Sequence, residues 1–181
     1  MAIYYVDGKK IESLADTENI PKFGGFNYPK TKYKEVVFDT TGDQTSNLFK
    51  IEGSVMIECI YGHVTTAIGT NLTAFQFELW DGTNATSITK NDGVLSSLPE
   101  GSFFVKTGKL NEGLDIESSA TANTVDEIDD KKAGFRLIQK AGGVDTYIRA
   151  KWTSTDTPPS GEIHVHIEWK PQTELGFVSV V

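Results

Sequence analysis

Apolar and polar residues alternate along much of this chain, most clearly in its second quarter. From Phe49 to Tyr61 the apolar side chains occupy every second position, and Gly53 keeps their phase. A period of two places one set of side chains in a core and the other toward solvent, as in a half-buried strand. We expect one long central strand here, then a sharp reversal or bulge at Gly62 into a second strand at Val64–Ile68. The side chains expected to point inward are Phe49, Ile51, Val55, Ile57, Cys59 and Tyr61.

Shorter runs with strand composition recur along the rest of the chain, separated by turn-forming residues. Helical periodicity is almost absent. These features predict an all-β fold, an antiparallel β-sandwich of the jelly-roll type with about nine short strands. Besides the central pair, the expected strands are Val36–Phe38, Phe75–Leu79, Phe103–Val105, Phe135–Ile138, Tyr147–Trp152, Ile163–Trp169 and Phe177–Val181.

The first 34 residues follow a different pattern. Ile3–Val6 and Lys9–Ile11 flank an Asp-Gly pair, which suits a tight hairpin turn. The residues after this hairpin show neither period and interleave aromatic side chains with lysines. We expect a hairpin and extended arm over residues 1–34, followed by a β-sandwich domain over residues 35–181. The arm either lies over its own domain or docks on a neighbouring subunit, and the expected interface residues are Tyr4, Tyr5, Phe23, Phe26 and Tyr28.

Two polar segments interrupt the sandwich pattern. Residues 39–46 predict a turn region, and residues 110–133 predict an exposed insertion rich in Gly, Ser, Asn, Thr and Asp. The acidic run Asp126–Asp130 offers oxygen ligands that suit calcium, but it lacks the Asp-X-Asp-X-Asp-Gly pattern of a calcium loop. Adjacent carboxylates are more often a solvated surface, which is the interpretation we favour.

Charge and composition argue against several classes of protein. The 181 residues carry a formal net charge of −8, with 25 acidic and 17 basic side chains, of which only Arg136 and Arg149 are arginines. Nucleic-acid binding requires clustered basic side chains, so we do not expect it. No signal peptide or membrane span is visible, so we expect a soluble protein made in a cytoplasm. Cys59 is the single cysteine and falls on the apolar parity, as expected for a packed small side chain.

The clearest candidate for a metal-binding motif is the run His164-Val165-His166-Ile167-Glu168. On a strand, His164, His166 and Glu168 share one face, and His63 is the one further histidine that could join them at a metal. The alternative is that these residues form the solvent face of a strand whose core residues alternate with them. The alternation fits this alternative throughout, so we expect no metal and no other cofactor.

Catalytic and sugar-binding motifs are also weak. No Gly-X-Ser-X-Gly turn and no glycine-rich phosphate loop is present, so we expect a protein that is not an enzyme. Trp80 has the parity of an exposed ring, whereas Trp152 and Trp169 share parity with core residues. One exposed tryptophan does not make a sugar-stacking platform.

The central stretch resembles a known family. Leu48, Phe49, Ile51, Gly53 and Val55, followed by Gly62-His63-Val64-Thr65-Thr66-Ala67-Ile68, are similar to a pattern in structural proteins of tailed-bacteriophage heads. The resemblance implies a head decoration (cement) protein on the capsid exterior, often a trimer, that clamps neighbouring major capsid subunits. It implies no catalytic residues. The alternatives are a carbohydrate-binding sandwich, as on phage fibres or in lectins, and a cupin-like metal-binding protein.

Overall fold

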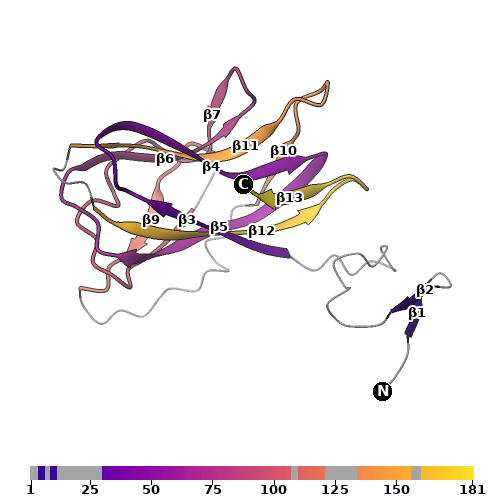
Figure 1. Cartoon of the computed structure of the whole chain (residues 1–181), viewed down its shortest axis with the longest axis horizontal. Helices are drawn as coiled ribbons and strands as arrows, with labels where there is room; N and C mark the ends of the chain where they lie inside the picture. The colour runs from indigo at the N-terminus through magenta and orange to yellow at the C-terminus, as the bar shows by residue number, and fades with distance from the viewer. Residues whose placement is uncertain (1–3, 7–8, 12–29, 107–109, 121–133, 156–159) are drawn as a thin grey trace.

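The computed structural model of the chain describes residues 4–6, 9–11, 30–106, 110–120, 134–155 and 160–181. These residues form strands, turns and loops without any helix, so none of them belongs to an apolar helix of membrane-spanning length. Two antiparallel sheets lie face to face as the two layers of a β-sandwich (Figure 1). The predicted all-β class and antiparallel sandwich are confirmed.

Sheet I is the six-stranded layer. Its strands are β3 (Lys30–Val37), β5 (Ser54–Thr66), β8 (Phe103–Lys106), β9 (Leu114–Glu117), β10 (Phe135–Ile138) and β12 (Glu162–Pro171). They follow the order β3–β12–β5–β8–β9, and β10 pairs with the first residues of β5. Among the described strands, β3 is therefore one edge of this sheet.

Sheet II is the five-stranded layer. Its strands are β4 (Gly42–Glu52), β6 (Leu72–Trp80), β7 (Ala85–Ser87), β11 (Thr146–Ser154) and β13 (Phe177–Val180). They follow the order β13–β4–β11–β6–β7. The predicted N-terminal hairpin is present as β1 (Tyr4–Val6) and β2 (Lys9–Ile11), which pair with each other.

Successive strands of the sandwich cross from one layer to the other. β3 and β5 lie in sheet I, β4 and β6 lie in sheet II, and the same alternation recurs from β10 to β13. Late strands are inserted between early ones, because β12 separates β3 from β5 and β11 separates β4 from β6. This order is compatible with two Greek keys, and the jelly roll stays our interpretation of it.

The core fills the space between the layers. On β12 the predicted core residues Ile163, Val165, Ile167 and Trp169 have no exposed surface, whereas the residues between them are half-buried on the outer face. Each such buried apolar side chain contributes about 1.5–3 kcal/mol to folding. Cys59 is also buried, as predicted.

The single long strand predicted from Phe49 to Tyr61 is wrong. Gly53 separates β4 from β5, and these two strands belong to different sheets. Its φ of +60° lies in the left-handed region that glycine adopts readily. A Cβ atom at this position would also lie 2.7 Å from the Leu175 carbonyl oxygen. Gly53 is therefore the corner at which the chain leaves one layer for the other.

The reversal predicted at Gly62 is also wrong, because β5 continues through it to Thr66. Gly62 faces inward, where a Cβ atom would lie 2.3 Å from the carbonyl oxygen of His164 and 2.4 Å from Cζ of Phe104. The glycine is needed here for the close approach of β12 and of the Phe104 ring, not for a turn.

A β-bulge reverses the parity of β5 and corrects the placement of Tyr61. Glu168 is paired with Cys59 and Trp169 with Ile57, so Glu58 is an extra residue in the ladder. Beyond this bulge Ile60 is fully buried. Tyr61, predicted to point inward, therefore lies half-buried on the outer face of sheet I.

Three strand boundaries differ from the predictions. Residues 30–34, assigned to the arm, are the first five residues of β3 and pair with β12. Residues 42–46, assigned to a polar turn, begin β4, and residues 114–117 of the expected insertion form β9. In β3 the residues on the inward parity before Val36 are lysines, which hides the strand from a search for apolar alternation. The predicted arm over residues 12–29 lies outside the described residues.

Candidate functional site

Aromatic and histidine side chains cover the outer face of sheet I. We call this surface the aromatic–histidine face. It includes all three histidines of the chain, and it draws its members from four strands. Its residues are Tyr33 on β3, Tyr61 and His63 on β5, Phe103 on β8, and His164 and His166 on β12.

Strand register explains why these side chains meet. His166 lies directly between Tyr33 and Tyr61 in one cross-strand row, and His164 lies opposite His63 in the next. Directly opposed residues in an antiparallel pair have Cβ atoms about 5 Å apart, so their side chains contact each other. The bulge at Glu58 is required for this arrangement, because it turns the second half of β5 so that its aromatic and histidine side chains face outward.

The rings form a continuous stack across the sheet. The centroids of Tyr61 and His166 are 5.0 Å apart with an interplanar angle of 5°, and those of Tyr33 and His166 are 5.5 Å apart at 28°. Phe103 extends the stack, with its centroid 5.9 Å from that of Tyr61. His63 lies 5.1 Å from His164 and 5.6 Å from His166, again between centroids. Stacking holds these side chains in defined rotamers before any partner is bound.

Electrostatics favour neutral imidazoles at two of these histidines. Partial burial lowers the pKa of His63, and the neighbouring His164 lowers it further. Partial burial likewise lowers the pKa of His166, with smaller contributions from His63 and His164. Both groups therefore favour the neutral imidazole more strongly than a solvent-exposed histidine does.

The three-histidine metal site considered from the sequence is only partly realised. His63, His164 and His166 do lie together on one face, but their rings stack on one another. Among the described residues, the group whose ligand atoms lie within 4.8 Å of one another is Glu35, Glu162 and His164. Sequence reasoning missed both carboxylates. Glu35 lies on β3, whose inward lysines hide the strand pattern, and Glu162 lies one residue before the expected strand Ile163–Trp169.

The tryptophans do not form a sugar-stacking platform. Trp152 and Trp169 are buried in the core, as their parity predicted. Trp80 is only partly exposed, and the guanidinium carbon of Arg149 lies 4.0 Å from the centroid of its ring. The carbohydrate alternative thus has no tryptophan surface to build on among the described residues.

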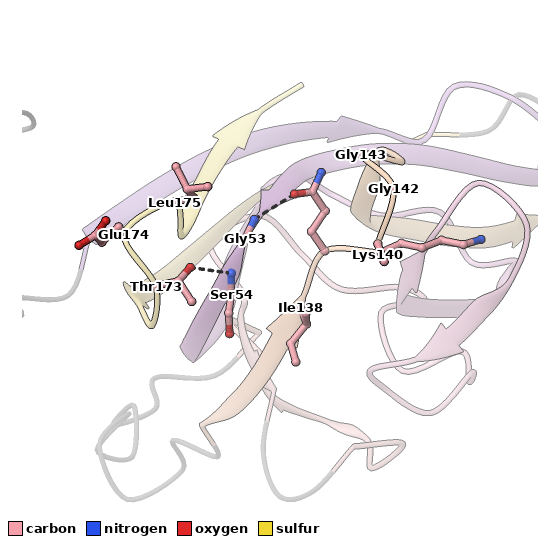
Figure 2. Close-up of a pocket in the computed structure, with 11 residues that line it drawn as sticks. Gly53, Ser54, Ile138, Lys140, Gly142, Gly143, Thr173, Glu174 and Leu175 are labelled. Carbon is pink, nitrogen blue, oxygen red and sulfur yellow. Dashed lines mark hydrogen bonds between the residues drawn. The ribbon is translucent and has the colours of Figure 1, made fainter.

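A second candidate surface is a groove at one end of the sandwich (Figure 2). This groove, with a volume of about 610 Å³, is lined by the corner at Gly53 and by the loops that follow β10 and β12. The Gly53 N–H donates to Oε1 of Gln139 at 3.1 Å, and the Ser54 N–H donates to Oγ1 of Thr173 at 3.2 Å. Leu175 on its rim is 80% exposed. We call this surface the loop groove.

Several candidates from the sequence lie where no side chain is described. Tyr4 and Tyr5 are in β1, whose backbone alone is described, and Phe23, Phe26 and Tyr28 lie outside the described residues. The acidic run Asp126–Asp130 also lies outside them. The proposed arm interface and the acidic insertion therefore stay predictions.

Comparisons with known proteins do not assign the chain to a family. No protein-family model, no curated protein and no solved structure matches it. The features of this chain that bear on its role are the two surfaces described above and the resemblance of the central stretch.

Proposed function

We propose that this protein is a non-enzymatic structural component of a virion. In this proposal it decorates the exterior of a tailed-phage capsid and clamps neighbouring major capsid subunits, as the resemblance of the central stretch implies. The aromatic–histidine face is the surface that docks on the shell. The observation that supports this assignment best is the ring stack that links Tyr33, His166, Tyr61 and Phe103 across four strands.

The chemistry of this face suits a protein partner. Aromatic side chains are enriched in the buried centres of protein interfaces, where they supply large contact areas at a low cost in conformational entropy. Here the rings already stack on one another, so little side-chain freedom is left to lose on binding. Tyr33 is 58% exposed and stands at the edge of the sheet, so a partner can cover it without any rearrangement of the core.

The predicted arm enters the fold beside this face. Lys30 begins the edge strand β3, two residues after the last aromatic residue expected at the arm interface. An arm contact and a face contact on the same shell would act as two linked binding sites. Once one contact forms, the second becomes effectively intramolecular, which raises the overall affinity without any new contact. Assembly as a trimer, as the resemblance implies, would multiply this effect.

Cosedimentation with purified capsid shells that lack the protein tests the docking surface. We expect the wild-type chain to sediment with shells and Tyr33→Ala to bind about tenfold or more weakly, because it removes the most exposed ring. Tyr147→Ala is the matched control, since this half-buried tyrosine lies on the outer face of sheet II. A wild-type chain that stays in the supernatant contradicts the capsid role. Equal losses for the two variants contradict the choice of face.

A truncation tests the arm. The cut should remove residues 1–29, since residues 30–34 belong to β3. We expect the far-UV circular dichroism of the sandwich to persist while the trimer or the shell contact is lost, as measured by light scattering and cosedimentation. If the truncated chain instead loses its strand signal, the arm is part of the core and not a clamp.

A further inference from the structure

We propose that Glu35, Glu162 and His164 bind a divalent transition-metal ion, for which Zn²⁺ is the representative. The site lies at the end of the aromatic–histidine face nearest Glu162 and shares His164 with that face, but the proposal does not require the capsid role. Glu35 is on β3, whereas Glu162 and His164 are on β12. One ligand atom from each of the three residues lies within 4.8 Å of the other two.

The strand pairing holds the three ligands together. Glu35 and His164 are directly opposed in the β3–β12 ladder, and Glu162 lies two residues before His164 on the same face. Sites built on paired strands are more precise than sites on loops, because the backbone fixes the relative position of the side chains. All three side chains reach solvent, so an ion can enter without opening the fold.

The spacing of His164 and Glu162 suits an ion better than a hydrogen bond. Nε2 of His164 and Oε1 of Glu162 are 3.6 Å apart, which is too long for a good hydrogen bond. Two ligands of a tetrahedral zinc ion, each bound at about 2.0–2.1 Å, are separated by about 3.4 Å. A small shift of either side chain therefore gives zinc-ligand geometry.

The surrounding residues support the same assignment. The Thr65 hydroxyl donates a hydrogen bond of 2.6 Å to Oε1 of Glu162, which orients that carboxylate in the way that outer-shell groups orient metal ligands. One imidazole nitrogen and two carboxylate oxygens make a donor set that Zn²⁺ accepts. Three protein ligands leave a fourth position open to water or to a group from a partner.

Isothermal calorimetry of the full chain with ZnCl₂ at pH 7.5, after dialysis against a chelator, tests the proposal. We expect one ion per chain. We also expect His164→Ala and Glu35→Gln each to weaken binding by about tenfold or more, since each removes one of three ligands. Addition of Co²⁺ should give the visible absorption bands of a low-symmetry site, and these bands should be lost in both variants.

Two matched variants make the ligand assignment specific. Glu168→Gln removes a carboxylate from the same strand and face, and His166→Gln removes the neighbouring imidazole, yet neither residue belongs to the three-ligand group. We expect both to bind zinc like the wild type. The absence of heat and of cobalt bands in the wild type would overturn the site. Loss of zinc binding in His166→Gln, together with wild-type zinc binding in Glu35→Gln, would overturn the ligand set. Shell binding in the presence of a chelator reports on the capsid role separately.

Discussion

The outer faces of the two sheets differ in chemistry although both lie on the same core. On sheet II the central charged side chains form ion pairs. Arg149 forms an ion pair with the buried Glu78, and Nζ of Lys50 lies 2.7 Å from a carboxylate oxygen of Asp145. On sheet I the corresponding central positions are occupied by stacked tyrosine and histidine rings, and the ion pair between Lys170 and Glu58 lies further along β12 and β5.

This difference bears on which of the two faces is the better candidate for contact with a partner. The buried Glu78 also accepts a hydrogen bond from Nε2 of Gln76 at 3.0 Å, so its carboxylate has two partners within the chain. A partner protein would have to compete with those contacts. On the aromatic–histidine face the rings contact each other, and Tyr33 keeps 58% of its surface exposed. We therefore propose sheet I, and not sheet II, as the docking surface.

The largest expected effect comes from breaking the support beneath the aromatic–histidine face. Gly62→Ala would place a methyl group within 2.4 Å of Phe104 and closer still to the backbone of His164. We expect a loss of about 4 kcal/mol or more in the free energy of unfolding, measured by urea denaturation. Gly113→Ala is the control, since no atom lies within 4 Å of its added Cβ. If the two variants are equally stable, β12 and the Phe104 ring can move away from the added methyl group, which would contradict the prediction.

The next effect comes from breaking the paired charges of sheet II. Arg149→Met leaves Glu78, which is 3% exposed, without its cation. Removal of one partner of a buried ion pair typically costs about 3–5 kcal/mol, and we expect a value near the lower limit because Gln76 remains bonded to the carboxylate. Urea denaturation measures this loss. The double variant Arg149→Met/Glu78→Leu should recover part of it, and a double variant no more stable than the single one would contradict the pairing.

A smaller effect on stability is expected within the ring stack. His166→Ala removes the ring between Tyr33 and Tyr61, and each lost aromatic contact is worth about 0.5–1.5 kcal/mol. Lys50→Ala on sheet II should have a smaller effect on stability than His166→Ala, because exposed ion pairs contribute little. Chemical denaturation gives both values. If the stack matters for docking, only His166→Ala weakens shell binding, whereas an equal loss in both variants would remove the contrast between the faces.

The smallest effect concerns acid pH at the β6–β7 turn of sheet II. Oδ1 of Asp81 accepts the N–H groups of Asn84 at 2.7 Å and Thr83 at 2.9 Å, and these bonds hold the pKa of Asp81 well below its usual range. The ionised carboxylate therefore stabilises the fold above its unfolded pKa, and this stability is lost as the pH falls through the folded pKa. Asp81→Ala should be less stable than the wild type at pH 7, with a smaller difference at pH 2.5. Urea midpoints at the two pH values measure this, and a constant difference would contradict it.

The sequence predicted the parts of the fold where alternation is regular. β12 keeps strict alternation from Ile163 to Trp169 without a bulge, so its core and solvent faces were both correct. The corner at Gly53 could not be recognised in the same way. Phe49 and Ile51 before it and Val55 after it face the same core from opposite layers, so a sharp corner preserves the phase that a straight strand would have.

The candidate site was harder to predict because it depends on register between distant strands. His164 and His166 were recognised together from their spacing, and His63 was correctly considered as their neighbour. Tyr61 was misplaced because the bulge at Glu58 reverses the parity. The run of three apolar residues Cys59-Ile60-Tyr61 breaks the alternation and is the sequence signal of that irregularity. Tyr33 was assigned to the arm because the inward parity of β3 carries lysines.

Hydroxyl-radical footprinting of the chain bound to capsid shells tests the central claim most directly, because it measures the exposure of individual aromatic rings on both faces at once. The aromatic–histidine face is predicted to be covered, so oxidation of Tyr33 and Tyr61 should fall on binding while that of Tyr147 and Trp80 on sheet II stays unchanged. Protection of Tyr147 and Trp80 with Tyr33 still fully oxidised would contradict the account.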